Sequence, residues 1–366
     1  MHEGEGTHRG QAIKGRGSTG WLPGRYAKTI AEKADDGWHE RDREGEIESA
    51  PQTEVREERA RSVISRNQSP DIPFSQSLNP YRGCEHGCSY CFARPSHAYL
   101  DLSPGLDFET KIFAKTNAPE VLREELARPG YQVSPIALGI NTDAYQPTER
   151  KLQLTRRIIE VLAETRHPLS LITKNALVER DLDLLAPMAR ENLVRVFLSI
   201  TTLDNQLSSK LEPRASAPHS RLRAVRALAG AGVPVGVMFA PAIPWVNDRE
   251  LEAVLEAARG AGATAAGYVL LRLPHEVAPL FRDWLQAHVP DRAAHVMSAI
   301  RQQRGGKDYD ATFGKRFRGE GVFADLLARR FELAKKRFGY DRHWYGAMDC
   351  TKFVPPRKPS PQGELF

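Results

Sequence analysis

The feature that most constrains the fold of this 366-residue chain is a regular alternation between short apolar runs and longer amphipathic stretches. The short runs are nearly continuous in apolar residues, which is typical of strands buried on both faces of a parallel sheet. The longer stretches carry apolar residues at spacings of three and four, which predicts helices. The predicted strands span residues 135–141, 169–174, 194–200, 233–240 and 265–271, and the predicted helices lie near 148–165, 178–189, 220–231 and 248–261.

A sixth strand is predicted at 76–81, and a helix near 119–127 completes its unit. Six β/α units are fewer than the eight that close a barrel. We therefore predict an α/β fold built as a partial, open TIM-like barrel. In such folds the chemistry lies at the carboxyl ends of the strands. Polar residues follow several of the predicted strands and are therefore expected at that rim.

Composition divides the rest of the chain into further segments. Residues 1–72 are rich in Gly, Glu, Arg and Ser and poor in aliphatic residues, which predicts an extension that is largely disordered or draped over the barrel. The barrel itself is expected at 73–273 and a helical cap at 274–353. The Pro-rich tail at 354–366 is predicted to be disordered.

Composition also indicates the compartment and excludes some classes of protein. No apolar run reaches about eighteen residues, so neither a membrane span nor a membrane partner is expected. The N-terminus lacks the apolar middle region of a secretory signal, which favours a cytoplasmic location. Three of the four cysteines lie within eight residues, which favours a metal site in a reducing compartment over a disulfide framework.

These clustered cysteines form the strongest motif in the chain. Cys84, Cys88 and Cys91 have the spacing C-x3-C-x2-C and follow the first predicted strand. Three thiolates can hold three irons of a cubane cluster and leave the fourth iron without a protein ligand. A metal ion with an open position is a place where a small molecule can bind.

A structural zinc site is the alternative for the same three thiolates. Its tetrahedral fourth ligand would be His86, His97 or Cys350. Structural zinc usually uses paired ligand doublets, and no second doublet occurs in the sequence. The pattern therefore favours the iron–sulfur cluster.

The cysteine motif resembles the signature of the radical S-adenosylmethionine superfamily, and four stretches are similar to its spore photoproduct lyase group. The stretches are RGCEHGCSYCFAR, NTDAYQPTE, LITKNALVERDLDLL and LSITTLD. The resemblance implies that Cys84, Cys88 and Cys91 hold a [4Fe–4S] cluster whose open iron chelates S-adenosylmethionine. It implies reductive cleavage to a 5′-deoxyadenosyl radical that abstracts a substrate hydrogen. A reducing partner such as flavodoxin or ferredoxin follows from that chemistry.

The resemblance also implies contacts to S-adenosylmethionine from the first two strand ends. Tyr90, beside the third cysteine, would lie against the adenine. Asn141, Thr142 and Asp143 stand where the family contacts the methionine amino group or the ribose. An aromatic face for a base and hydrogen-bonding groups for a ribose are what this ligand requires.

Residues after the next two strands are carried over in the same way. Lys174 resembles the residue that pairs with the methionine carboxylate, and Arg214 is a second candidate for that role. Ser199 is similar to a ribose-contacting residue, and Glu212 is a further ribose candidate. Without the resemblance, Lys174 is a surface lysine at a strand end, and Ser199 and Thr142 are local hydrogen-bonding residues.

One position departs from the spore photoproduct lyase pattern. The family carries a hydrogen-donating cysteine just before the polar cluster of the second strand, and Ile140 stands there in this chain. Cys350 is the remaining thiol and is predicted as the hydrogen donor if the C-terminal segment folds over the barrel mouth. The alternative is an inert cysteine.

The C-terminal part is basic, with 15 Lys+Arg against 8 Asp+Glu in residues 301–366. Aromatic and basic side chains interleave there, which suits nucleic acid, although the aromatics equally fit the buried side of an amphipathic helix. The leading hypothesis is a radical enzyme of spore-photolyase-like type, a lyase in DNA repair acting on nucleic acid. The alternatives are radical modification of a protein or small molecule, and a non-catalytic iron–sulfur protein that binds nucleic acid.

Overall fold

The computed structural model describes residues 12–27, 51–340 and 347–356. Its main element is a sheet to which β2 (Ser65–Arg66) is added antiparallel at one edge. The remaining strands are parallel: β3 (Gln76–Leu78), β6 (Ile136–Leu138), β7 (Leu169–Thr173), β8 (Val194–Ser199), β9 (Val235–Ala242) and β10 (Ala265–Leu270). The spatial order is β10-β9-β8-β7-β6-β3-β2.

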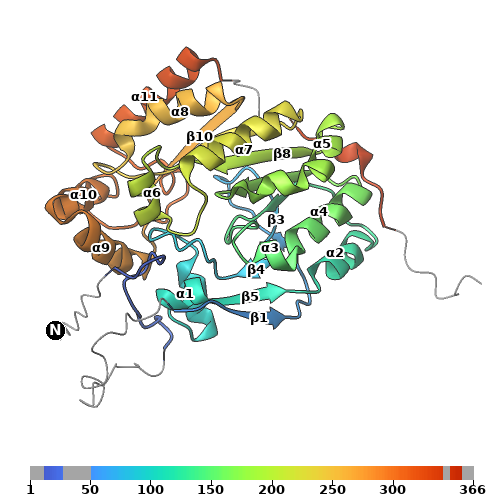
Figure 1. The fold of residues 1–366 in the computed structure, drawn as a ribbon, viewed down its shortest axis with the longest axis horizontal. Coiled ribbons are helices and arrows are strands. Elements are labelled where there is room, and N and C mark those ends of the chain that lie inside the picture. Colours follow the sequence, from blue (N-terminus) through green and yellow to red (C-terminus); the bar gives the residue numbers. More distant parts are fainter. Residues whose placement is uncertain (1–11, 28–50, 341–346, 357–366) are drawn as a thin grey trace, which may run out of the picture.

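The six parallel strands coincide with the six predicted ones to within a few residues, and they follow one another across the sheet in chain order. Among the described strands β2 and β10 are the two edges and do not pair with each other. The sheet is therefore strongly twisted but not closed (Figure 1). This confirms the prediction of a partial, open barrel.

Helices follow the strands and cover the outer side of the sheet (Figure 1). The helix predicted at 148–165 is divided, because Gln153 adopts a left-handed conformation with φ of 50°. The helices predicted at 178–189 and 248–261 each begin with a 3-10 turn. The elements are α2 (Ala118–Leu126), α3 (Glu149–Leu152), α4 (Leu154–Glu164), η2 (Ala176–Asp181), α5 (Leu182–Arg190), α6 (Asn205–Leu211), α7 (Pro218–Gly230), η3 (Asp248–Glu250) and α8 (Leu251–Gly260).

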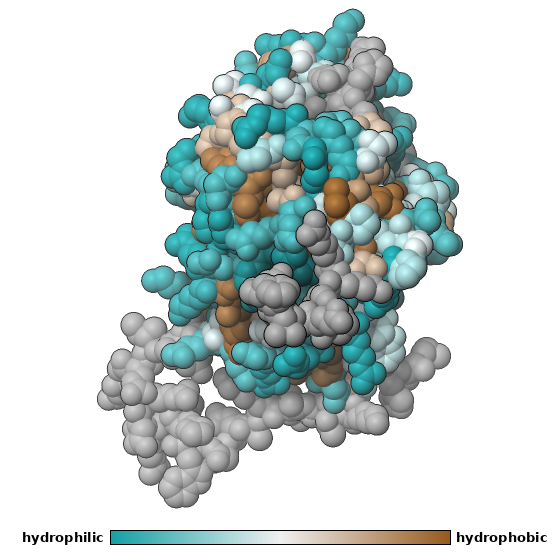
Figure 2. Space-filling model, turned by 90° about the vertical axis from the view of Figure 1, so that its right-hand side faces the viewer, coloured by the Kyte–Doolittle hydropathy of each residue, from teal (hydrophilic) through white to brown (hydrophobic). Residues whose placement is uncertain are grey.

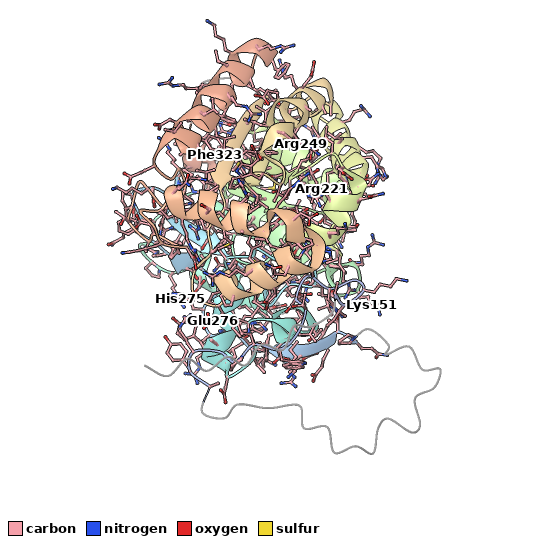
Figure 3. All side chains as sticks on the ribbon, turned by 90° about the vertical axis from the view of Figure 1, so that its left-hand side faces the viewer. Lys151, Arg221, Arg249, His275, Glu276 and Phe323 are labelled. Carbon is pink, nitrogen blue, oxygen red and sulfur yellow. The ribbon has the colours of Figure 1, made fainter. Side chains whose placement is uncertain are left out.

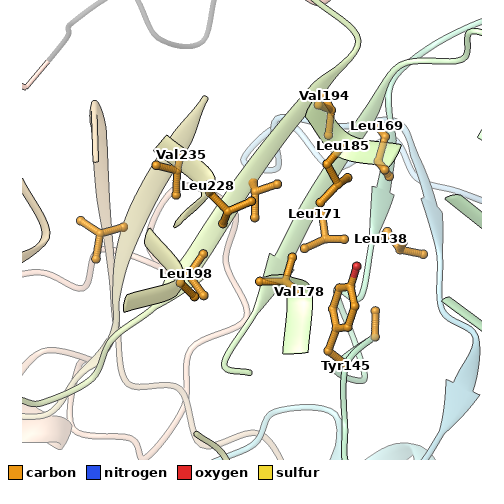
Figure 4. Close-up of a cluster of buried hydrophobic side chains, with 14 of the residues drawn as sticks. Leu138, Tyr145, Leu169, Leu171, Val178, Leu185, Val194, Leu198, Leu228 and Val235 are labelled. Carbon is orange, nitrogen blue, oxygen red and sulfur yellow. The ribbon is translucent and has the colours of Figure 1, made fainter. Parts of the chain in front are cut away.

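The hydrophobic core lies between these helices and the sheet (Figure 4). Leu171 of β7 and Leu198 of β8 meet Leu185 of α5 and Leu228 of α7, and all four side chains are fully buried. Each such side chain contributes about 1.5–3 kcal/mol of hydrophobic stabilisation. This core fixes the positions of the strand ends.

The other side of the strands differs from the prediction. Along β7 and β8 fully buried residues alternate with half-buried ones, such as Ser170 and Ile172. The prediction that every strand is buried on both faces is therefore wrong for these strands. An open barrel covers the outer face with helices, while its inner face lies toward the site.

A second, three-stranded sheet has the order β1-β5-β4. It consists of β1 (Glu54–Glu58), β5 (Lys111–Lys115) and β4 (Tyr81–Arg82). The expectation of a largely disordered or draped extension does not hold for residues 51–66, which provide β1 and β2. Two short helical segments precede β5, namely η1 (Arg94–Leu100) and α1 (Leu106–Thr110).

The C-terminal part is helical, as predicted for the cap. It contains α9 (Val277–His288), α10 (Pro290–Gln302), α11 (Val322–Phe338) and η4 (Cys350–Lys352). The first two helices form one flank of the molecule (Figure 3), and α11 packs beside α8. The opposite flank is mainly hydrophilic with small hydrophobic patches (Figure 2). Among the described residues, none of the helices is long and apolar enough to cross a membrane.

Candidate active site

The cysteine loop, residues 83–92, begins directly after β4. Its two glycines, Gly83 and Gly87, have φ values of 77° and 66°, which a residue with a side chain rarely adopts. The Cys84 amide donates to the carbonyl of Phe108 at 2.9 Å, so α1 supports the loop from below. All of the cysteines are free thiols, with Cys84 buried and Cys88 and Cys91 half-buried.

The loop environment opposes thiolates that lack a metal. Burial raises the pKa of Cys84 well above its ordinary value, and the charge of Asp143 and the neighbouring thiols add to this effect. Burial likewise raises the pKa of Cys88 to about 12. A coordinating metal removes the proton from such a thiol and replaces it with positive charge. The loop is thus suited to a cationic centre.

Asp143 connects the ends of β6 and β7 to the cysteine loop. Its carboxylate accepts hydrogen bonds from the Thr173 hydroxyl and the Lys174 amide, both at 2.7 Å. It also lies 3.4 Å from Nδ1 of His86 in the loop. Burial would raise the pKa of Asp143, but His86 and these hydrogen bonds hold it at about 2. Both oxygens are therefore engaged within the chain, and Asp143 positions Lys174.

A second buried network surrounds Glu212, at the end of α6. Its carboxylate accepts hydrogen bonds from the hydroxyls of Tyr90 and Thr201 and forms an ion pair with Arg221. Burial would raise the pKa of Glu212, but Arg221 and Lys174 hold it below its ordinary value. Glu212 therefore remains a buried anion.

Lys174 lies between this network and the cysteine loop. Its ammonium group is 5.9 Å from the centre of the Tyr90 ring. Burial would lower the pKa of Lys174, but Glu212 and Cys88 hold it above its ordinary value. A charged lysine thus lies beside the cysteine loop and an aromatic ring. The ammonium group can bind a carboxylate, and the ring can stack on a purine base.

The remaining predicted residues lie around the same rim. Thr142 donates to the carbonyl of Tyr81 at 2.9 Å, and Ser199 donates to the carbonyl of Ala240 at 3.1 Å. Asn141 is exposed. The structure therefore brings the predicted polar residues together at the carboxyl ends of the strands, although these two hydroxyl groups already donate to backbone carbonyls.

Arg214 faces the cysteine loop from the segment after α6. Its guanidinium forms an ion pair with Glu85 at 3.1 Å and donates to the Thr53 hydroxyl at 3.0 Å. Its amide donates to the carbonyl of His86 at 3.2 Å. Arg214 thus ties the loop to the residue before β1.

Comparison with known proteins decides between the readings of this site. Residues 78–258, which contain the cysteine loop and strands β4 to β9, match the sequence profile of the radical SAM superfamily. An uncharacterised protein of Mycobacterium tuberculosis is 39% identical over 233 residues, which covers 63% of this chain and 68% of the relative. This chain belongs to the radical SAM superfamily.

Two more distant similarities add to this comparison. An uncharacterised protein of Methanocaldococcus jannaschii is 28% identical over 173 residues, covering 47% of this chain and 62% of the relative. The structure of spore photoproduct lyase complexed with dinucleoside spore photoproduct has a TM-score of 0.55 at 17% identity, covering 78% of this chain and 79% of that one. The latter similarity shows a common fold. Radical SAM proteins use a [4Fe–4S] cluster and S-adenosylmethionine, and these are the cofactors of this chain.

The residues of the cysteine loop fit such a cluster. The hydroxyl oxygen of Ser89, between the second and third cysteines, is buried without a hydrogen-bond partner. A sulfide-rich cluster provides the acceptors that such a buried hydroxyl lacks. Within the described part of the chain, no three Cys, His, Asp or Glu side chains are gathered closely enough for a single metal ion. A cubane does not require that arrangement, because each thiolate binds a different iron.

The structure does not bring Cys350 to this radical SAM site. Cys350 begins η4, and the preceding Asp349 amide donates to the carbonyl of Asn192, just before β8. Val354 donates similarly to Thr165, just after α4. Cys350 therefore lies at the amino ends of the strands, opposite the cysteine loop. The predicted position over the barrel mouth is wrong, and with it the support for Cys350 as a hydrogen donor.

Sequence analysis missed the contribution of residues 12–27, the N-terminal strap. The amides of Gly17 and Ser18 donate to the two carboxylate oxygens of Glu109 at 3.0 and 2.8 Å. Glu109 is fully buried and also pairs with Arg94 at 2.5 Å, whose Nε donates to the carbonyl of Cys88 at 2.9 Å. The strap thus forms one wall of the cluster site.

The strap packs against the cysteine loop without space for a side chain. A methyl group placed on Gly17 would come within 1.6 Å of the carbonyl oxygen of Gly87. The strap is also attached at its other end, where Arg25 pairs with Glu276 at 2.9 Å beside α9 (Figure 3). The closely spaced glycines in GRGSTG were the available signal in the sequence.

Proposed function

We propose that Cys84, Cys88 and Cys91 hold the [4Fe–4S] cluster and that Lys174 binds the carboxylate of S-adenosylmethionine. The observation that carries this proposal is the ammonium group of the half-buried Lys174 beside the Cys88 thiol and the Tyr90 ring. When bound, the cluster and S-adenosylmethionine supply a one-electron reduction and a 5′-deoxyadenosyl radical.

The surrounding residues position the ligand and exclude water. Tyr90 offers its ring to the adenine while Glu212 fixes its hydroxyl. Asp143 holds the backbone of Lys174, and Asn141, Thr142 and Ser199 line the same rim. Arg214, paired with Glu85, is the second cation near the loop. Water exclusion matters because a reactive radical must meet the substrate before it meets solvent.

We further propose that the substrate is a nucleic acid and that the reaction is of the lyase type used in DNA repair. The shared fold with spore photoproduct lyase, which is seen with a dinucleoside photoproduct, and the basic C-terminal part support this substrate class. Ile140, in place of a donor cysteine, favours an outcome that differs from photoproduct reversal. A cytoplasmic location and an electron donor such as flavodoxin or ferredoxin belong to the same proposal.

The test is anaerobic reconstitution with iron and sulfide, followed by reduction with dithionite in the presence of S-adenosylmethionine. Chromatography should detect 5′-deoxyadenosine and methionine in the wild type. A chain that carries the full cluster by iron analysis and spectroscopy and yet forms no 5′-deoxyadenosine would contradict the proposed chemistry. If the substrate were instead a protein or a small molecule, 5′-deoxyadenosine would form at a rate that added nucleic acid neither raises nor lowers.

A further inference from the structure

Two arginines and three phenylalanines alternate at the barrel rim next to the cysteine loop. The Arg272 guanidinium lies 4.7 Å from the ring centre of Phe92 and 4.6 Å from that of Phe317. The Arg316 guanidinium lies 4.8 Å from Phe317 and 4.9 Å from Phe313. We call this sequence of groups the arginine–phenylalanine stack. It begins immediately after Cys91 and ends in the Gly-rich segment that precedes α11.

The stack is held rigidly from several elements. Arg316 donates to both carboxylate oxygens of Asp71, at 2.9 and 2.5 Å. The carbonyl of Phe317 accepts from the amide of Leu270, the last residue of β10, at 3.0 Å. Arg304, almost fully buried, donates to the carbonyls of Lys315 and Leu271 at 2.8 and 3.0 Å. The Gly-rich segment is therefore fixed against the carboxyl end of β10.

Arg272 differs from Arg316 in its partners. Its two flat faces are covered by Phe92 and Phe317, but among the described residues no carboxylate pairs with its N–H groups. Burial lowers the pKa of Arg272 below its ordinary value and Arg316 adds to this effect, while Tyr309, Asp71 and Cys91 act against it without a direct bond. Asp71, which neutralises Arg316, is the carboxylate directly bonded to the stack. The positive charge of Arg272 is therefore available to an external anion.

The ends of the stack are open to solvent. Phe92 is 41% exposed and Phe313 is 57% exposed, although each ring is covered on one side by a guanidinium. A guanidinium between rings presents its N–H fork in a fixed direction, which matches the oxygens of a phosphate. Exposed aromatic rings beside such a cation are the usual platform for unpaired bases.

We propose that the arginine–phenylalanine stack is a nucleotide subsite, in which Arg272 binds a backbone phosphate and the exposed rings of Phe92 and Phe313 stack on bases. This inference rests on the proposed function and names the residues that would present a nucleic acid to the radical. The stack lies next to the cluster site, because Phe92 adjoins the third cysteine and Arg272 follows β10 at the active-site rim. A phosphate bound there holds its nucleotide beside the cluster loop.

The experiment measures binding of a fluorescein-labelled single-stranded oligothymidylate to the reconstituted full-length chain by anisotropy, under nitrogen. R272Q should weaken binding about tenfold, and F313A should weaken it about fivefold while F313Y binds like the wild type. R226Q removes the same charge from an exposed position on α7 and should change affinity less than twofold. Phe313 is exposed, so its variants test the subsite even if R272Q disturbs the fold.

Affinities of R272Q and F313A equal to that of the wild type would overturn the proposal. Competition distinguishes charge from base recognition. Unlabelled oligothymidylate should displace the probe well, whereas polyglutamate of equal charge should not. Equal displacement by the two polymers would indicate an acidic protein as the ligand and would overturn the nucleotide subsite. The wild type separates the subsite from the radical chemistry: 5′-deoxyadenosine formation without nucleic-acid binding removes the subsite and the nucleic-acid substrate but leaves the radical chemistry. Binding without 5′-deoxyadenosine removes only the radical chemistry.

Discussion

The two ends of the parallel strands contain similar residue types and use them differently. At the carboxyl ends, cysteines, a histidine and a tyrosine lie among three charged side chains, namely the buried Glu212 and the half-buried Asp143 and Lys174. At the amino ends, His167 and Tyr131 lie beside the ring of Phe353, and Cys350 is near Tyr131. There the Tyr131 hydroxyl is 2.9 Å from Nε2 of His167, and Phe353 packs edge-on against the imidazole at 5.4 Å.

This difference separates groups that serve a ligand from groups that serve stability. Burying a charge is costly unless a partner compensates it. At the carboxyl ends this cost applies fully to Glu212 and in part to Asp143 and Lys174. The cationic ligand and the cluster that we propose add further compensation. At the amino ends the imidazole of His167 is buried, and burial holds its pKa at about 4, so it stays neutral. We therefore expect substitutions at the first end to affect cofactors and substitutions at the second to affect stability.

The largest expected effect follows from removing one cysteine of the loop. C88A should lose nearly all bound iron and the visible absorbance of the cluster after reconstitution, because a cubane needs all three thiolates that the loop provides. C350A should retain both. Iron analysis and absorbance spectra measure the result. A comparable loss of iron in C350A would abolish the distinction between the two ends.

The second test concerns the proposed contact between Lys174 and the carboxylate of S-adenosylmethionine. K174M should weaken S-adenosylmethionine binding by about 10- to 100-fold, because a charge-assisted contact to the carboxylate is lost. Iron content should not change. Equilibrium dialysis with labelled S-adenosylmethionine measures the affinity, and K151M, at an exposed position on α3, is the control. Unchanged affinity in K174M would indicate that Arg214, rather than Lys174, binds the carboxylate.

The third test concerns the strap that closes the carboxyl end. G17A should lower the free energy of unfolding by about 2–3 kcal/mol, because the new methyl group has no space against Gly87. G20A is the matched control, since a methyl group there meets nothing within 4 Å. Urea titration measures the stability, and trypsin cleavage after Arg16 reports release of the strap. Equal behaviour of the two variants would show that the strap is not closed in solution.

The smallest effect is expected on stability when the pH is lowered, through His167 at the amino ends. The folded-state pKa of His167, about 4, lies below the ordinary value of about 6.5, so the unfolded chain binds the proton more tightly. Its contribution to stability is full above pH 6.5 and is lost as the pH falls toward 4, by about 2 kcal/mol at pH 5. H167Q should reduce this loss, whereas H219Q, at an exposed position on α7, should not. Urea titrations at pH 7.5 and 5 provide the comparison.

The sequence predicted the main sheet well because its signal is local. Each parallel strand is a short apolar run, and the polar residues that follow it lie near the rim. The resemblance to the radical S-adenosylmethionine superfamily then supplied the roles of Lys174 and Asp143. The cysteine loop was found because its three ligands are close in sequence. The positions of β7 and β8 follow directly from such runs.

Features that depend on distant contacts were not predicted. β1 is exposed and polar, and it exists because its backbone pairs with β5. The strap contributes backbone amides rather than an apolar pattern, and its partner Glu109 is about ninety residues away. The position of Cys350 depends on backbone hydrogen bonds to Asn192 and Thr165. No periodicity in the sequence reports such pairings.

The strap also has a consequence for the order in which the molecule forms. Its hydrogen bonds to Glu109 join residues 92 and 91 positions apart, so the ribosome releases residues 17 and 18 long before their partner exists. Contacts of such long sequence separation carry a loop-closure cost and form after local structure. The cysteine loop and α1 are therefore complete before the strap docks. During that interval the loop lacks the wall that Gly17 forms against Gly87, and the first-made segment is among the last to reach its place.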